Sequence, residues 1–340
     1  MGFSIEKNML KYGIIGCGAA AKVHLFHLLR EHPEVQITAI CDPVAPKDEL
    51  FTSVAVPHYN DYKEMLKQEQ LDAVSIVSPH YLHYQQALAC AEKNIHVLCE
   101  KPLALEYAQA CEVVERFQEH NLVLTAMLPR RFFNNTLALQ KVIADERLGK
   151  IESINYTLNV HKKDDYYLGW RGQKNLVGGG VLMCQALHDL DRLTYLFGQP
   201  QIVSAQLQTH HKNITVEDWA EVQLLFPNNI PAFIHADTIS EDTWKGIIEI
   251  QGTKGRVVLN SEATDVWEVS EIEKPAVNED RYDPLVKPRY YGPSHGEVID
   301  DFVQSILKKK EPFITAASTL PTLKLLEEIY GWKNKYLSNS

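Results

Sequence analysis

Short apolar runs that alternate with longer segments of helical period occupy the first 126 residues of this 340-residue chain. Runs of this length form strands and the segments between them form helices, so the alternation predicts βα units that feed a parallel sheet. The predicted strands cover residues 11–15, 36–41, 73–77, 96–99 and 123–126. Residues 1–126 are therefore predicted to form a doubly wound α/β domain of the Rossmann type, with a mostly parallel sheet.

The pattern changes after residue 126, where strand-like runs follow one another with short turns between them. Short connections favour antiparallel neighbours. The predicted strands cover residues 150–161, 201–208, 218–226, 231–239, 245–251 and 256–260. Residues 127–293 are predicted to form an α+β domain with a large, mostly antiparallel open sheet, which we interpret as a substrate and oligomerisation domain.

Helical period accounts for most of the remaining sequence after residue 126. The predicted helices cover residues 134–147, 181–197, 295–308 and 317–337. The last two fall within residues 294–340, and we expect this C-terminal segment to pack back on the body of the protein.

Composition and charge narrow the range of functions. The chain carries 44 acidic and 34 basic residues, a net charge of −10, without a basic cluster that could bind a nucleic-acid backbone. Its six cysteines include no C-x-x-C pair, which argues against a zinc site and against a disulfide scaffold. No apolar segment is long enough to span a membrane, and the N-terminus lacks the apolar core of a signal peptide. We expect a cytoplasmic protein that binds no metal, membrane or nucleic acid.

A glycine-rich turn follows the first predicted strand and opens into a helix near Lys22. Its sequence, Gly16-Cys17-Gly18-Ala19-Ala20-Ala21, is a G-x-G-x-x-A form of the dinucleotide-binding fingerprint. In that motif the first small residue makes the tight turn, the second lets the backbone approach a pyrophosphate, and the third allows close packing of helix on strand. The helix N-terminus then binds the anion. A plain tight turn also explains many matches to this pattern, so the motif needs support from its context.

Asp42 supplies that context, because it ends the second predicted strand 24 residues beyond Gly18. This is close to where the acid that binds the adenosine ribose is expected. A carboxylate there accepts hydrogen bonds from the ribose hydroxyls and repels a 2′-phosphate, which favours NAD over NADP. Lys47 leaves NADP as an alternative cofactor, since a nearby cation could offset the charge of a 2′-phosphate. The alternative role of Asp42 is to cap a turn.

The fourth predicted strand ends in Glu100-Lys101-Pro102, at the carboxyl edge of the sheet where open α/β folds bind their ligands. Pro102 restricts Lys101 to extended backbone conformations, which helps to fix the direction of its ammonium group. A surface Glu-Lys pair at the end of a strand is the simplest interpretation of this tripeptide taken alone.

Three consecutive glycines at 178–180 precede the apolar helix of the second domain and permit backbone conformations where a side chain would obstruct a ligand. On that helix Cys184, His188 and Asp191 have the spacing i, i+4 and i+7, which predicts that they project from one face. A lone histidine on an apolar helix is more often a core residue, but its fixed distance from the glycine run favours a functional one.

Taken in order along the chain, these motifs resemble the glucose–fructose oxidoreductase/inositol dehydrogenase (Gfo/Idh/MocA) family. The resemblance covers nearly the whole chain, and the combination is specific for the family but not for a substrate. It is carried by Gly16-Cys17-Gly18, Ser78-Pro79 with His83, the run Val97-Leu98-Cys99-Glu100-Lys101-Pro102-Leu103, and Gly178-Gly179-Gly180 followed by His188 and Asp191.

The resemblance implies the rest of the cofactor site. Ser78 and Pro79 would lie beneath the cofactor at the end of the third strand, while His83 and Glu100 would line the nicotinamide region. Together with the glycine turn (Gly16, Gly18, Ala19, Ala21), Asp42 and Lys101, these residues form the predicted NAD-binding set.

The resemblance also implies the catalytic residues. Lys101 would contact the substrate oxygen and the nicotinamide ribose, and its ammonium would stabilise the alkoxide that develops as hydride leaves carbon. His188 would serve as general base or proton relay. Many relatives carry Asp, and others Asn or Thr, where this chain has Cys184. Either the chemistry proceeds on Lys101 and His188 with Cys184 only shaping the pocket, or dehydrogenase activity has been lost.

Further pocket candidates come from the segment Tyr166-Tyr167-Leu168-Gly169-Trp170-Arg171-Gly172, which resembles a segment that reaches over the nicotinamide and substrate in several relatives. Trp170 can stack and Arg171 can bind a phosphate or carboxylate, so both join the predicted cofactor set. The alternative is an aromatic patch that closes a domain interface. The predicted substrate contacts are Lys101, Arg131, Tyr167, Cys184, His188 and Tyr291, with Arg130, Tyr290 and His295 as weaker candidates.

The sequence therefore predicts an NAD-dependent oxidoreductase that moves hydride from a secondary hydroxyl of a sugar or cyclitol. Its Tyr-Tyr and Gly-Trp-Arg-Gly elements resemble members that oxidise C3 of UDP-sugars, so a nucleotide-linked sugar is one candidate. The alternatives are a non-catalytic NAD-binding regulator or sensor, and a reductase of a non-sugar carbonyl. By the same resemblance we expect a homodimer or homotetramer, formed through the open face of the second-domain sheet.

Overall fold

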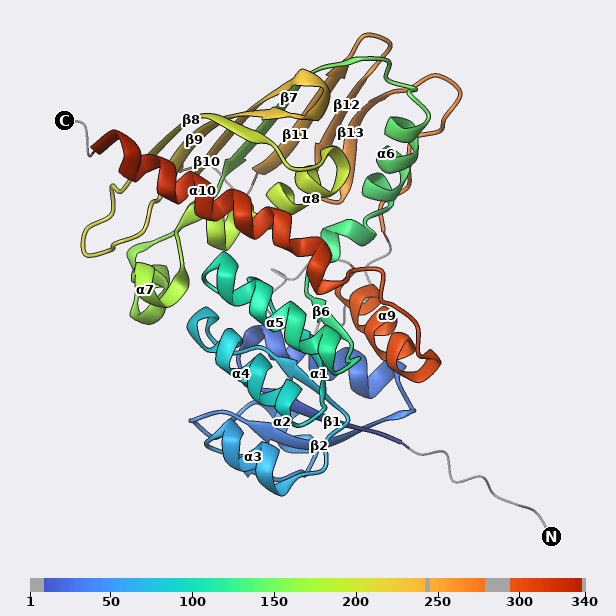
Figure 1. Cartoon of the computed structure of the whole chain (residues 1–340), viewed down its shortest axis with the longest axis vertical. Coiled ribbons are helices and arrows are strands. Elements are labelled where there is room, and N and C mark those ends of the chain that lie inside the picture. The colour runs from blue at the N-terminus through green and yellow to red at the C-terminus, as the bar shows by residue number, and fades with distance from the viewer. Residues whose placement is uncertain (1–8, 242–244, 279–293, 338–340) are drawn as a thin grey trace. The chain divides into compact units, whose positions relative to one another are not determined.

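The structure is a computed structural model, and it describes residues 9–241, 245–278 and 294–337. The chain divides into two compact units (Figure 1). The first unit comprises residues 1–104, 108–127 and 281–317. The second comprises residues 105–107, 128–280 and 318–340. The two C-terminal helices are thus divided, since α9 (His295–Lys308) belongs to the first unit and α10 (Leu320–Leu337) to the second.

A six-stranded parallel sheet in the order β3-β2-β1-β4-β5-β6 forms the centre of the first unit. This order is that of a dinucleotide-binding Rossmann fold, and the predicted doubly wound domain is confirmed. The short strand β3 was not predicted, because two residues show no period. The strands are β1 (Leu10–Ile15), β2 (Val35–Cys41), β3 (His58–Tyr59), β4 (Ala73–Ile76), β5 (His96–Cys99) and β6 (Leu124–Ala126).

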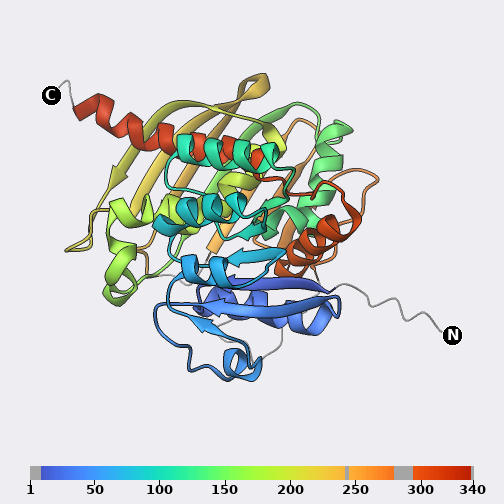
Figure 2. The same ribbon diagram turned by 60° about the horizontal axis from the view of Figure 1, so that its bottom comes forward.

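The helices of the first unit pack in groups beside this sheet (Figures 1 and 2). Helix α1 packs against α2 and α9, and α3 packs against α4. Asp48 and Asp61 begin α2 and α3 by accepting hydrogen bonds from backbone N–H groups of the first turn, as capping residues do. The helices are α1 (Ala19–Glu31), α2 (Glu49–Ser53), α3 (Tyr62–Gln68), α4 (His80–Glu92), α5 (Tyr107–Glu119) and α9.

The second unit is built on a seven-stranded sheet in the order β13-β12-β11-β7-β10-β9-β8. Strands β7 and β10 pair in parallel and the other pairs are antiparallel, so the predicted mostly antiparallel sheet is confirmed. Strand β13 was not predicted. The strands are β7 (Ile151–Asn159), β8 (Gln201–Gln208), β9 (Trp219–Phe226), β10 (Ile230–Asp237), β11 (Lys245–Gly252), β12 (Arg256–Asn260) and β13 (Ala263–Glu268).

One face of this sheet is covered by helices, because α8 packs against α10 and α10 packs against β8 (Figure 1). Strand β9 shows the expected period of two: Ala220, Val222, Leu224 and Phe226 are buried, and the residues between them are at least partly exposed. The α-helices are α6 (Asn134–Ala144), α7 (Lys174–Val177), α8 (Leu187–Phe197) and α10.

Short helices of other types connect these elements. A π-helical turn over Leu182–Ala186 leads directly into α8, and 3₁₀ turns cover Asp164–Tyr167 and Gly169–Gly172. None of the helices in the part of the chain that the structure describes has the length and apolar character that crossing a membrane requires.

Candidate active site

The glycine turn after β1 has the geometry that a dinucleotide-binding loop requires. Gly16 has a φ of +97°, and a Cβ there would lie 2.6 Å from the carbonyl oxygen of Val77, so only glycine fits. At Gly18 an added Cβ would meet no atom within 4 Å, which leaves space above the backbone for a ligand. Helix α1 begins at Ala19, not near Lys22, so the turn opens directly onto a helix N-terminus.

Two further residues of the fingerprint serve the packing behind this loop. Ala21 is fully buried, as expected of the small residue that lets the helix approach the strand. Gly18 begins α1 as a capping residue without a side chain, and no side-chain cap bond is present there. The first N–H groups of the helix therefore remain available to an anion.

Asp42 lies beside the glycine turn. Its Oδ2 accepts a hydrogen bond from the Cys17 backbone N–H at 2.9 Å, and its Oδ1 accepts one from Val44 N–H at 2.9 Å. The second bond is that of a turn cap and the first ties the carboxylate to the glycine loop, whereas the role of Asp42 toward a ribose stays a prediction. Lys47, the residue that leaves NADP as an alternative cofactor, is exposed.

The strand ends next to the glycine turn carry the other predicted cofactor residues. Ser78 follows β4, its hydroxyl donates to Gln86 at 2.6 Å, and Pro79 begins α4. The ring nitrogens of His83 lie 2.7 Å from the Pro102 carbonyl oxygen and 2.8 Å from that of Ser78. This fully buried ring therefore links the segment after β4 to the segment after β5.

The titration state of His83 depends on two opposed influences. Burial lowers its pKa, and the hydrogen bonds to two carbonyl oxygens act against burial. A carbonyl oxygen only accepts, so a ring with one proton can satisfy just one of the two contacts. The lowered pKa favours that neutral form, in which one nitrogen donates and the other does not.

Glu100 comes directly after β5 and lies among several titratable groups. Its Oε2 accepts from the Lys101 backbone N–H at 3.3 Å, and the peptide bond between Lys101 and Pro102 is cis. Its Oε1 lies 3.3 Å from Nε2 of His24, a residue that the sequence motifs do not single out. The signal for His24 is that it is one of two histidines, with His27, among the otherwise apolar buried residues of α1. Only the fold shows that this face meets Glu100.

In the second unit the glycine run is explained by protein atoms. A Cβ on Gly180 would lie 1.6 Å from the Glu217 carbonyl oxygen, and one on Gly179 would lie 1.9 Å from the Tyr330 hydroxyl. The Glu217 carboxylate accepts from Gly180 N–H at 2.8 Å, Leu182 N–H at 3.1 Å and the Tyr330 hydroxyl at 2.9 Å. These glycines therefore admit a buried carboxylate that caps the helix, whereas the sequence pattern alone favoured a ligand in that place.

The helix after the glycine run does not have the uniform period assumed from sequence. The π-helical turn contains Cys184, and α8 carries His188 and Asp191. Cys184 and His188 are partly exposed, whereas Asp191 is 1% exposed and its two oxygens accept from Arg131 at 2.7 and 2.8 Å. Asp191 thus lies on the buried side of the helix. The Cys184 thiol donates to the Gly179 carbonyl oxygen at 3.6 Å.

The predicted substrate contact at Arg131 is corrected by the structure. Its guanidinium is 1% exposed and binds Asp191 and both the hydroxyl and the carbonyl oxygen of Ser318, with distances of 2.7 to 2.9 Å. A charge this deeply buried needs its partners for folding. Arg131 is therefore a structural residue of the second unit. Arg130 is also buried and forms an ion pair with Asp189.

The two tyrosines of the aromatic segment, Tyr166 and Tyr167, have different surroundings in the second unit. Tyr167 is 7% exposed and its hydroxyl contacts that of Thr238. Tyr166 is more open, and its hydroxyl accepts from the Gln185 amide at 2.6 Å. Burial raises the pKa of both phenols, so both remain neutral at physiological pH. Tyr166, not Tyr167, is the tyrosine next to polar groups of the π-helical turn.

Two cations gather around Tyr166. The Arg171 guanidinium lies 4.7 Å from the Trp170 ring centre and 5.5 Å from that of Tyr166. The Lys162 ammonium lies 4.9 Å from the Tyr166 ring centre. Burial and the charge of Arg171 lower the pKa of Lys162. Of the other predicted pocket residues, Tyr290 and Tyr291 lie outside the described residues, and His295 is buried at the start of α9.

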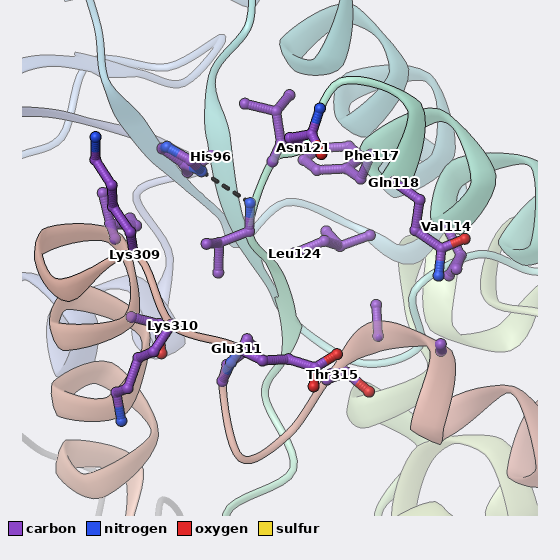
Figure 3. Close-up of a pocket in the computed structure, with 17 residues that line it drawn as sticks. His96, Val114, Phe117, Gln118, Asn121, Leu124, Lys309, Lys310, Glu311 and Thr315 are labelled. Atoms are coloured by element: carbon purple, nitrogen blue, oxygen red, sulfur yellow. Dashed lines mark hydrogen bonds between the residues drawn. The ribbon is translucent and has the colours of Figure 1, made fainter.

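A cavity of about 530 Å³ lies elsewhere in the first unit. It is lined by the ends of α5 and α9 and by the starts of β5 and β6, where His96 accepts from the Val123 backbone N–H at 2.8 Å (Figure 3). This is the amino-terminal edge of the sheet, whereas the glycine turn and Glu100 lie at the carboxyl edge where such folds bind ligands. The cavity is therefore not the cofactor site.

The strand order, the glycine turn and Asp42 define a dinucleotide-binding Rossmann protein. The family model described as the oxidoreductase family with an NAD-binding Rossmann fold matches residues 10–127, and the model of the Gfo/Idh/MocA C-terminal domain matches residues 136–258. The chain belongs to the Gfo/Idh/MocA family of NAD-binding oxidoreductases.

Several relatives match this chain over most of its length. An oxidoreductase from Synechocystis is 26% identical and covers 89% of this chain and 88% of its own. The WlbA dehydrogenase from Chromobacterium violaceum is 26% identical, with a TM-score of 0.85 and coverage of 97% and 95%. WlbA from Bordetella pertussis is 25% identical, with a TM-score of 0.82 and coverage of 95% of both chains. Both WlbA structures contain NADH and UDP-GlcNAcA.

Proposed function

We propose that this protein is an NAD-dependent dehydrogenase that removes hydride from a secondary hydroxyl of a UDP-linked sugar, with Lys101 and His188 as the proton relay. The observation that carries the substrate class is the full-length similarity to WlbA dehydrogenases, whose structures hold NADH and UDP-GlcNAcA. The cations around Tyr166 support it, because UDP-sugars are anionic and a pair of cations favours an anionic ligand.

The residues of the first unit fit NAD. The open space at Gly18 and the free N–H groups at the start of α1 suit a pyrophosphate, and Asp42 is held beside that loop by Cys17 N–H. Bound NAD would supply the hydride acceptor. Asp42 would accept from the ribose hydroxyls, and Glu100 and His83 would line the region next to Lys101.

Side chains of this protein would carry out the proton transfer. The Lys101 ammonium would stabilise the alkoxide that forms as the hydroxyl loses its proton, since a positive charge favours developing negative charge in a site that excludes water. His188 would accept that proton. The Cys184 thiol cannot replace a carboxylate in holding a hydroxyl or an imidazolium, because a thiol is a weak hydrogen-bond partner.

Recognition of the substrate's anionic part would use Lys162 and Arg171. Arg171 lies over the rings of Trp170 and Tyr166, and its planar guanidinium is suited to two parallel bonds to a phosphate or carboxylate. Lys162 is partly buried beside the same ring, and an anion bound there would relieve the repulsion from Arg171 that lowers its pKa.

The test is a substrate screen that follows NADH absorbance with NAD and a panel of UDP-sugars, free sugars and cyclitols. Turnover with a UDP-sugar, lost in Lys101→Ala but kept in Lys93→Ala, supports the proposal; Lys93 is an exposed lysine of the same unit. Near-normal turnover in Lys101→Ala would refute the mechanism. Turnover with a free sugar or cyclitol alone would correct the substrate class.

Substitutions of two neighbouring lysines, Lys162 and Lys163, test whether Lys162 binds the anionic part of the substrate. Lys162→Met should raise the KM for a UDP-sugar roughly tenfold or more with little change in kcat, because a charge-assisted bond contributes about 1.5–3 kcal/mol of binding. Lys163 is exposed, and Lys163→Met should leave both constants unchanged. Equal effects of the two substitutions would remove Lys162 from the site.

Cys184 motivates a second candidate, a non-catalytic NAD-binding sensor. Its thiol donates to the Gly179 carbonyl oxygen, so the position that carries Asp in many relatives offers only a weak acceptor here. NADH binding without turnover of any member of the panel, in either direction of hydride transfer, would favour the sensor. Turnover of a non-sugar carbonyl with NADH would favour the reductase alternative.

We also expect a homodimer or homotetramer. The face of the second-unit sheet opposite α8 and α10 presents the partly exposed side chains of Trp219, Leu225 and Phe233, whose apolar area favours association. Light scattering that shows only a monomer would contradict this expectation.

A further inference from the structure

A chain of hydrogen bonds runs through the interior of the first unit to Glu100. The Tyr12 hydroxyl lies 2.9 Å from the Ser75 hydroxyl, and the Ser75 hydroxyl lies 2.9 Å from Nδ1 of His24. Nε2 of His24 lies 3.3 Å from Oε1 of Glu100. Tyr12, Ser75 and His24 are each 0% exposed, so none of them can exchange these partners for water.

The direction of the protons along this chain depends on what each group can do. A carboxylate only accepts, so Nε2 of His24 carries the proton and donates it to Glu100. Nδ1 can then accept from Ser75, and the Ser75 oxygen can accept from Tyr12. Burial holds the pKa of Tyr12 well above its usual value, so its hydroxyl remains a donor. With a neutral His24, every proton in this chain of hydrogen bonds thus has an acceptor.

A doubly protonated His24 would reverse this arrangement. Nδ1 would donate to Ser75, and the chain would then hold one proton more than it has acceptors, so the Ser75 or the Tyr12 hydroxyl would need another acceptor in a fully buried place. Among the described residues, the side-chain hydroxyls of Tyr12 and Ser75 have no hydrogen-bond partner beyond each other and His24. The chain therefore holds one tautomer of His24, with its donor directed at Glu100.

The orientation of the Glu100 carboxylate in turn affects Lys101. Burial alone would raise the pKa of Glu100, but the hydrogen bond from His24 and the nearby groups His295 and Lys101 lower it overall, so the carboxylate stays ionised. One oxygen is held by His24 and the other accepts from the Lys101 backbone N–H. With both oxygens engaged, the carboxylate has one orientation.

His24 also joins two parts of the proposed site. It lies on α1, the helix whose N-terminus would bind the pyrophosphate of NAD, and it contacts the residue directly after β5. We propose that His24 is a positioning residue, which fixes the ionised Glu100 carboxylate against Lys101 and so couples the cofactor-binding helix to the lysine. The importance of Lys101 rests on the proposed function, whereas the effect of His24 on Lys101 does not.

The test measures Lys101 directly, without a substrate. Competitive acetylation over a range of pH, read by mass spectrometry of the peptide that contains Lys101, gives the pH at which its amine becomes reactive. A fixed carboxylate favours the ammonium form, so removing it in Glu100→Gln should lower that midpoint by about 1 pH unit. Among the described residues, the other titratable groups that interact with Glu100 or Lys101 include His83, His295 and Cys99, which the variants leave in place.

Two amide substitutions of His24 distinguish positioning from mere filling of space. The side-chain nitrogen of glutamine falls near Nε2 of the ring and can still donate to Glu100, whereas that of asparagine falls near Nδ1 and cannot reach it. His24→Asn should therefore lower the Lys101 midpoint in the direction of Glu100→Gln. His24→Gln should preserve most of the wild-type value. Tyr12→Phe removes only the far end of the chain and should leave the midpoint unchanged.

Folding is checked by thermal unfolding and by NADH fluorescence, so that a collapsed variant is recognised before its lysine is titrated. Equal midpoints in folded His24→Asn and the wild type, with Glu100→Gln shifted, would overturn the role of His24. An unshifted Glu100→Gln would overturn the coupling of Glu100 to Lys101. If the midpoints shift as expected but the substrate screen finds no turnover, this inference stands and the proposed function fails.

Discussion

Replacement of Gly180 by alanine tests how the helix that carries His188 is held. An added Cβ would lie 1.6 Å from the Glu217 carbonyl oxygen, 2.7 Å from its carbonyl carbon and 2.9 Å from its nitrogen. All three atoms belong to the backbone, so no side-chain rotation relieves the contact. The two segments must separate, and the bonds from Gly180 N–H and Leu182 N–H to the Glu217 carboxylate must lengthen or break.

The magnitude comes from those bonds. A hydrogen bond to a charged group contributes roughly 1.5–3 kcal/mol, and the Glu217 carboxylate accepts two such bonds from the backbone of the glycine run and the helix start. Gly180→Ala should therefore cost about 4 kcal/mol, which corresponds to a fall of roughly 10 °C in the melting temperature of a domain of this size. Burial raises the pKa of Glu217, so a separated carboxyl group can take up a proton and recover part of this cost.

The assay is thermal unfolding followed by circular dichroism at one heating rate, with Gly331→Ala as the control. Gly331 is an exposed residue within α10, and a Cβ there would meet no atom within 4 Å. Alanine at that place should stabilise the protein by about 0.5–1 kcal/mol. The two glycine-to-alanine substitutions thus have opposite signs. A Gly180→Ala protein that melts within about 3 °C of the wild type would refute the reasoning.

Three further substitutions test other parts of the structure. Gly18→Ala should leave the melting temperature unchanged but weaken NADH binding about tenfold or more in a fluorescence titration, because its Cβ meets only the space proposed for the pyrophosphate. Arg131→Met should cost about 3–5 kcal/mol in urea unfolding by leaving Asp191 buried without its counter-charge, and a second substitution, Asp191→Leu, should restore much of that loss. Burial alone would raise the pKa of Asp218, but hydrogen bonds from two neighbouring histidines lower it below 3.8. Asp218→Asn should therefore be less stable than the wild type at neutral pH, and the difference should vanish as the pH falls below 3.8, where the wild type loses the contribution of the ionised carboxylate.

The features that the sequence predicted correctly are those with local causes. Strands β4, β5 and β6 are buried along almost their whole length and so appear as short, mostly apolar runs, whereas β3 has two residues and leaves no such signal. Gly16 needs a positive φ, and this demand comes from a turn of a few residues. Asp42 lies beside that turn, as its place at the end of the next strand predicts, whereas its role toward a ribose stays a prediction.

The features that the sequence missed depend on residues far apart in the chain. Arg131 was assigned to substrate because exposed and buried arginines look alike in a sequence, and its partner Asp191 is 60 positions away. The glycine run was assigned to a ligand for a similar reason, since Glu217 lies 37 positions beyond Gly180. In both cases the residue type was noticed and the partner was not.

The spacing of Cys184, His188 and Asp191 shows how a local rule can mislead. The rule that i, i+4 and i+7 share one face assumes 3.6 residues per turn throughout. The π-helical turn at Leu182–Ala186 adds a residue to one turn, so the residues after it are rotated by about 100° relative to the residues before it. π-helical turns are rare in proteins and often occur at functional sites. The turn at Cys184 therefore supports the proposal that this helix presents His188 to a ligand, on grounds independent of the family resemblance that first singled the histidine out.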